Sequence, residues 1–139
     1  MWIRVIAGIV ALGLAANGLD MLWRPLEWYH SLASVEHTGP FNGHFVRDVG
    51  VAYLASALGI GLAAWRTDWL IPAGSVALVF LGLHAGLHLL EWWHGHSSAL
   101  HAQWVDIVGV YLPPLLLLLW MLSGYLFGRF FGYGEKPHA

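Results

Sequence analysis

Residues 70–93 read LIPAGSVALVFLGLHAGLHLLEWW, and this stretch decides the fold. It is long and apolar enough to cross the hydrocarbon core of a bilayer, which takes about 20 residues of α-helix. Its second half also carries His84, His88 and Glu91. Ionisable groups at membrane depth are rare and generally face protein or water. At about 100° per residue, the three side chains fall within about 60° of one helix face, so they can converge on one ion, cofactor or proton path.

Three further apolar stretches lie at residues 3–22, 44–65 and 104–127. We treat the first as a retained helix rather than a cleaved signal. Tryptophans cluster at or near the ends of the four stretches, as an interfacial aromatic belt requires: Trp2, Trp23, Trp28, Trp65, Trp69, Trp92, Trp93 and Trp104. The sequence therefore predicts an all-α membrane protein, a four-helix bundle that forms one domain over residues 1–139.

The composition agrees with this class of protein and excludes others. Hydrophobic residues make up 58% of the chain and charged residues 10%, whereas a soluble domain carries about a quarter charged residues. The net charge of −2 gives no reason to expect a nucleic-acid partner. Cysteine is absent, which excludes disulfides, thiolate metal sites and cysteine nucleophiles.

Basic residues predict the orientation. With four spans both termini share a side, which collects Arg4, Arg66, Arg129 and Lys136. The positive-inside rule then places both termini in the cytoplasm. Eight of the nine histidines fall in the outer loops or the outer half of the third span, so the polar chemistry is one-sided.

Prolines mark two local features. Pro25 suits the first turn of a helix, and apolar residues recur at helical spacing after it, so residues 25–36 are predicted to form a short amphipathic helix in the outer interface. Pro113 and Pro114 are predicted to kink the fourth span and to free backbone carbonyls near Gly109 and Val110.

The leading functional hypothesis is a metal site. His84, His88 and Glu91 would supply ligands from the third span, and His44 and Asp48, also four residues apart, would complete the shell. Nitrogen and oxygen ligands without sulfur suit copper, iron, zinc or manganese. Residues expected to orient these ligands are Asp20, Arg47, His94, Gln103 and Asp106. Such a protein would be a membrane metallo-oxidoreductase or a subunit of one.

A haem is a separate possibility. Haem b ligated by two histidines needs one histidine from each of two facing helices, and His44 with His84 or His88 could provide them.

Two other readings stay open. The ionisable residues Asp20, Arg47, Asp48 and Glu91 could pair with one another and only fix the helix packing, as in an accessory subunit of a larger membrane complex. A proton or solute path is the third reading. The inner halves of the spans lack ionisable residues, which counts against a path.

Residues 47–59 read RDVGVAYLASALG, a charged pair followed by small residues at the start of the second span. With the four spans, the short chain and the Pro-containing connector, this resembles the DoxX-like group of small bacterial membrane proteins. The resemblance implies a bacterial inner membrane. Because some members are linked to quinone-coupled thiosulfate oxidation, it also implies a redox role with a quinone as partner.

Overall fold

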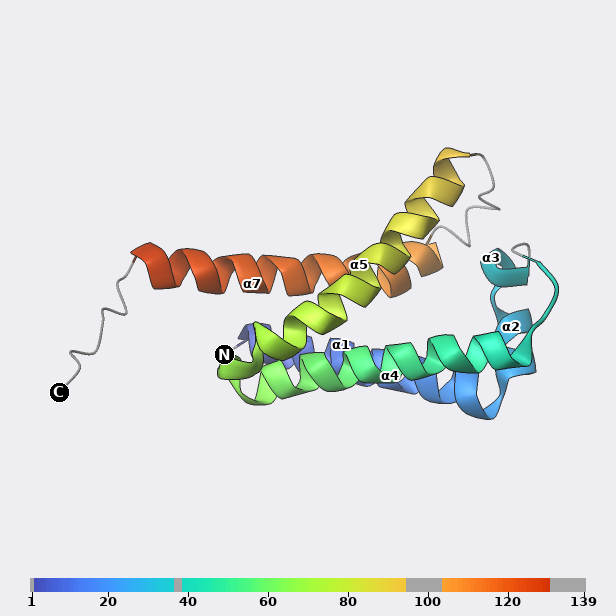
Figure 1. Ribbon diagram of the computed structural model, residues 1–139, viewed down its shortest axis with the longest axis horizontal. Helices are drawn as coiled ribbons and strands as arrows, with labels where there is room; N and C mark the ends of the chain where they lie inside the picture. The colour runs from blue at the N-terminus through green and yellow to red at the C-terminus, as the bar shows by residue number, and fades with distance from the viewer. Residues whose placement is uncertain (1, 37–38, 95–103, 131–139) are drawn as a thin grey trace.

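Four long helices make up the protein in the computed structural model, which describes residues 2–36, 39–94 and 104–130 (Figure 1). No strand occurs in the described residues, so the all-α four-helix prediction is confirmed. The long helices are α1 (Trp2–Trp23), α4 (Gly43–Trp65), α5 (Pro72–Trp93) and α7 (Leu112–Phe130), and a π-helical turn, η2 (Ile107–Tyr111), precedes α7.

All four are long and apolar enough to cross a membrane. The spans are Trp2–Trp23, Gly43–Trp65, Pro72–Trp93 and Trp104–Gly124, each within three residues of the predicted limits. Large apolar side chains such as Leu12, Leu58 and Leu83 are exposed on their outer faces. An apolar surface of this kind is stable against lipid tails and not against water, so the chain is a multi-pass membrane protein.

Helices α1 and α4 lie side by side and run in opposite directions, while α5 crosses obliquely to reach α7 (Figure 1). Glycine permits the closest approaches. A Cβ placed on Gly18 of α1 would lie 2.7 Å from the carbonyl oxygen of Gly50 on α4, and one on Gly59 would lie 2.8 Å from the carbonyl of Ala73. Within a bilayer, such small residues let helices associate through close packing because lipid tails are as apolar as the helix surface.

The core between the helices is built from small and medium apolar residues. It holds Ala7, Ala11, Leu14 and Met21 of α1, Val46, Tyr53, Ala57, Ile60 and Ala63 of α4, Ala77 and Leu81 of α5, and Leu117 and Trp120 of α7.

Polar contacts close the end of the bundle at which α1 begins. The Arg4 guanidinium donates from Nε to the Ala64 carbonyl at 2.6 Å and from Nη2 to the Trp65 carbonyl. These carbonyls end α4 and lack partners within the helix. In the following turn, η1 (Thr67–Trp69), a side-chain hydrogen bond from Arg66 lowers the pKa of Asp68. The basic residues Arg4 and Arg66 therefore share one end of the bundle.

The connector after α1 differs from its prediction as one helix. It forms two, α2 (Pro25–Ser31) and α3 (Ala33–Glu36), because Leu32 takes an extended backbone conformation. Contacts within the connector hold this break: Tyr29 Oη donates to the carbonyls of Glu36 and Gly39, and His30 Nδ1 lies 2.5 Å from Glu36 Oε1. The segment therefore folds back on itself instead of continuing along one axis.

The predicted disturbance by Pro113 and Pro114 takes the form of the π turn. A proline lacks the N–H that the carbonyl four residues earlier would accept. The chain responds with a wider turn, in which the Leu112 N–H donates to the carbonyl of Ile107, five residues back. Such turns are frequent at functional sites, and this one follows directly after Asp106.

Candidate functional site

A cavity in the described part of the bundle has two histidines and an aspartate in its wall. It measures about 500 Å³ and lies between α1, α4, α5 and the π turn, with His84, His88 and Asp106 in its wall. We call it the histidine cavity. The rest of its lining is mostly apolar, from residues such as Ile9, Val10, Leu14, Val49, Val108, Leu112 and Pro113. A volume of this order is typical of small-molecule sites, which combine apolar walls with a few placed polar groups.

His84 is half-buried among aromatic rings. Its imidazole stacks on Phe80 at 5.8 Å between centroids and 12° between planes, and meets Tyr53 edge-on at 5.8 Å. The His88 ring lies 4.8 Å away, one helical turn along α5. Within the described residues, the His84 ring has no hydrogen bond or ion pair. His84 also lines the cavity, so its imidazole can offer a hydrogen bond to a guest there.

His88 is held by a carboxylate. Its Nδ1 lies 3.5 Å from Asp106 Oδ2, and the two side chains are 20% and 21% exposed. Burial of either group alone is unfavourable, so the pairing stabilises both in an apolar wall. With Nδ1 directed to Asp106, the other ring nitrogen, Nε2, can donate to or accept from a ligand.

The connector covers one side of the cavity. Trp28 of α2 donates from Nε1 to Asn17 Oδ1 of α1 at 2.9 Å, and both residues line the cavity. Leu32 and Val35 add apolar cover from the same connector. The break at Leu32 therefore lets the connector turn over the cavity.

The remaining predicted metal ligands lie elsewhere. His44 Nε2 pairs with Asp48 Oδ2 at 3.4 Å at the start of α4, where the side chains are 88% and 62% exposed. Neither lines the histidine cavity, and Glu91 is exposed and does not line it either. In residues 2–36, 39–94 and 104–130, no three His, Asp or Glu side chains are grouped so that they could hold a metal ion. The predicted five-ligand set is not assembled there, and His44 does not face the cavity as a second haem ligand.

Of the residues expected to orient a metal ligand, only Asp106 contacts a predicted ligand at the cavity. Asp20 lines a different surface hollow and pairs with Arg24 at 2.5 Å, and His94 Nδ1 donates to the Leu90 carbonyl at 2.7 Å. Arg47 donates to the carbonyls of Leu22 and Gly43, each at 3.3 Å. Gln103 lies outside the described residues. Among the described residues, the predicted network of Asp20, Arg47, Asp48 and Glu91 does not form: the two aspartates pair with Arg24 and His44, and Arg47 donates to backbone carbonyls.

Sequence reasoning missed four members of the site: Asn17, Trp28, Tyr53 and Phe80. Asn17 carried a readable signal, since it is an amide inside an otherwise apolar span. The three aromatic residues gave none, because their role depends on which helix faces meet.

Comparisons with protein-family models, with curated proteins and with solved structures find no match to this chain. The chemistry of the site therefore rests on its own geometry. That geometry offers two imidazoles, one of them carboxylate-bound, beside an apolar space within the membrane-spanning part of the protein.

Proposed function

We propose that the protein binds a lipid-soluble small molecule with a hydrogen-bonding head group in the histidine cavity, and that this molecule is of the quinone class. One observation carries the proposal: His84, His88 and Asp106 line a cavity that is otherwise mostly apolar. A molecule that reaches this space from the bilayer must be apolar overall, yet it needs polar atoms to match the imidazoles.

A quinone meets both conditions. Its carbonyl oxygens accept hydrogen bonds from imidazole N–H groups, and the hydroxyls of the reduced form donate to an unprotonated imidazole nitrogen. Among the described residues, neither ring nitrogen of His84 nor Nε2 of His88 has a hydrogen-bond partner. The flat ring of such a molecule also suits a wall that contains Tyr53 and Trp28.

The His88–Asp106 pair would give this site a role in the proton transfers of a redox process. Reduction of a quinone to a quinol takes two electrons and two protons. Imidazole and carboxylate side chains placed within hydrogen-bond reach of a substrate can transfer protons to and from it. The electrons would come from a partner protein, which joins the redox role to that of an accessory subunit in a larger membrane complex.

We further propose that the protein resides in a bacterial inner membrane with both termini in the cytoplasm. The gathering of Arg4 and Arg66 at one end of the bundle supports this orientation. The DoxX-like resemblance stays a prediction and supplies the bacterial setting.

Titration tests the proposal. Protein in lipid nanodiscs is titrated with a benzoquinone that carries a decyl tail, and binding is followed by quenching of tryptophan fluorescence. We expect His84→Ala and His88→Ala each to weaken binding about tenfold, the equivalent of one hydrogen bond of about 1.4 kcal/mol. His44→Ala is the matched control, because its exposed pair with Asp48 lies outside the cavity. Equal affinity in all four proteins would overturn the proposal.

Metal or haem binding stays a separate prediction with its own test. Elemental analysis and an absorption spectrum of the purified protein would reveal a stoichiometric metal or a Soret band. Loss of that signal in His88→Ala, but not in His44→Ala, would assign the metal or haem to the histidine cavity. Absence of any signal would remove the prediction.

A further inference from the structure

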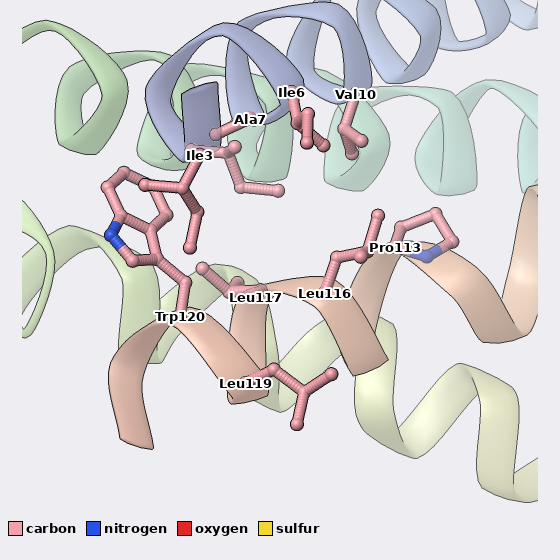
Figure 2. Close-up of a pocket in the computed structure, with 10 residues that line it drawn as sticks. Ile3, Ile6, Ala7, Val10, Pro113, Leu116, Leu117, Leu119 and Trp120 are labelled. Atoms are coloured by element: carbon pink, nitrogen blue, oxygen red, sulfur yellow. The ribbon is translucent and has the colours of Figure 1, made fainter. Parts of the chain in front are cut away.

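An apolar groove between α1 and α7 adjoins the histidine cavity. Its volume is about 280 Å³, and Val10 and Pro113 line both spaces. Figure 2 shows Ile3 and Ile6 on α1 opposite Leu116 and Trp120 on α7, with Pro113 at the other end of the groove from Trp120. We call it the tail groove, and every side chain in its lining is apolar or aromatic.

We propose that the ligand of the histidine cavity carries one long hydrocarbon or prenyl tail, and that this tail lies in the tail groove with its end toward Trp120. This inference rests on the proposed function, because the head group must first bind at His84 and His88. It adds the shape of the ligand: an amphiphile with a polar ring at one end and a single extended chain.

The distribution of polar groups along α1 supports this ligand shape. The two spaces together follow α1 from Asn17 to Ile3, which is about 21 Å at 1.5 Å per residue. Asn17, His84, His88 and Asp106 all lie in the histidine cavity, and none of them lines the tail groove. The lining therefore changes once, from partly polar in the histidine cavity to apolar in the tail groove, which matches a ligand with a polar head and an apolar tail.

The packing of α7 explains why space remains for a tail. Helix α7 packs mainly on α5 and approaches α1 at only a few points, whereas α1 packs along α4. Lipid tails are as apolar as the groove, so hydrophobicity alone does not select its occupant. The head group at the histidines must therefore anchor the tail, and an unanchored phospholipid chain is the competing occupant.

Photolabelling locates the tail. The probe is the decyl benzoquinone with a diazirine at the tail end, and labelled residues are identified by mass spectrometry after irradiation in nanodiscs. We expect labels on the groove-lining residues near Ile3 and Ile6 of α1 and Trp120 of α7. The combined substitution of His84 and His88 by alanine should remove these labels. Labelling by a phospholipid that carries a diazirine at the end of its acyl chain should not change with that substitution.

Narrowing the groove provides a second test. Ile6→Trp adds bulk at a lining position that is already 45% exposed, so the fold should tolerate it. We expect about tenfold weaker binding of the decyl probe, the usual scale for overfilling a fitted site. The same head group without a tail should bind as before. Leu12→Trp, on the outer face of α1, is the control and should change neither affinity.

The outcomes separate this inference from the proposed function. Binding of the decyl probe with labels on the outer face of α5, near Val76 and Leu83, would overturn the tail placement and leave the head site standing. Labelling of the groove by the phospholipid probe that excess quinone does not displace would also overturn it. If no probe binds to the wild-type protein, the proposed function itself fails.

Discussion

At the scale of single residues, a histidine and an aspartate form a pair at two places in the protein, and the surroundings of the two pairs differ. His44–Asp48 and His88–Asp106 have separations of 3.4 Å and 3.5 Å. The first pair is exposed at a helix start, and the second is mostly buried beside the histidine cavity. Surroundings rather than composition therefore distinguish the candidate site from an ordinary surface pair.

Removal of the carboxylate should affect the two pairs differently. We expect Asp106→Ala to lower the free energy of unfolding by about 1–3 kcal/mol, because it leaves His88 in an apolar wall without its partner. Asp48→Ala should change it by at most about 0.5 kcal/mol, since the exposed pair is solvated in either state. Unfolding of the two variants in mixed detergent measures both values. Equal losses would contradict the account of the buried pair.

The sequence allowed part of the site to be predicted at this scale. His84, His88 and Asp106 stood out because ionisable groups are rare in apolar spans. The expected convergence of His44 and Asp48 with them was not found, since spacing on one helix says nothing about which face meets a neighbour. Both residues lie at the exposed first turns of α4 and bind each other.

At the scale of helices, close packing of α1 on α4 depends on glycine. Gly18→Ala would bring a Cβ within 2.7 Å of the Gly50 carbonyl, so the helices must separate. We expect a loss of about 1–3 kcal/mol in the free energy of unfolding. Gly82→Ala is the control, because nothing lies within 4 Å of its added Cβ, and it should be neutral or slightly stabilising. An equal loss in both variants would argue against this contact.

The π turn before α7 gives a second prediction for a helix. Replacing Pro113 and Pro114 by alanine restores two backbone donors and should stabilise the fourth span, since proline inside a helix costs about 3 kcal/mol. A return to regular α-helix would rotate Asp106 by about 100° relative to the residues that follow it, and so away from His88. We therefore expect a higher melting temperature together with weaker binding of the decyl benzoquinone. Unchanged affinity would show that the π turn does not position the site.

For the helices, the sequence predicts the spans but not the local breaks and turns within and between them. The four spans follow from apolar length alone, and their limits were predicted to within three residues. The break at Leu32 was not predicted, because it depends on contacts from Tyr29 to Gly39 and from His30 to Glu36 that the helical pattern does not reveal. The proline pair predicted a disturbance near Gly109 but not its geometry, which depends on how the freed carbonyls find new donors.

At the scale of the whole molecule, polarity differs between the two ends of the bundle. Arg4 of α1 and Arg66 after α4 lie at one end, and the histidine cavity with its connector lies toward the other. The proposed ligand site thus lies toward one end of the bundle, and the tail groove leads away from it.

The proposed orientation can be tested with single cysteines, since the native chain has none. Thr67 and Pro40 are both exposed and lie on opposite sides of α4 in the chain. We expect Pro40→Cys to react with a membrane-impermeant maleimide in intact cells, and Thr67→Cys to react only after lysis. The reverse pattern would place the termini outside.

Native mass spectrometry of the protein released from its own membrane tests the central claim most directly. We predict a bound molecule with the mass of a long-tailed quinone on the wild-type protein and on His44→Ala. The variant with alanine at both His84 and His88 should lack it. Phospholipid masses alone, or the same quinone on all three proteins, would contradict a ligand site at these two histidines.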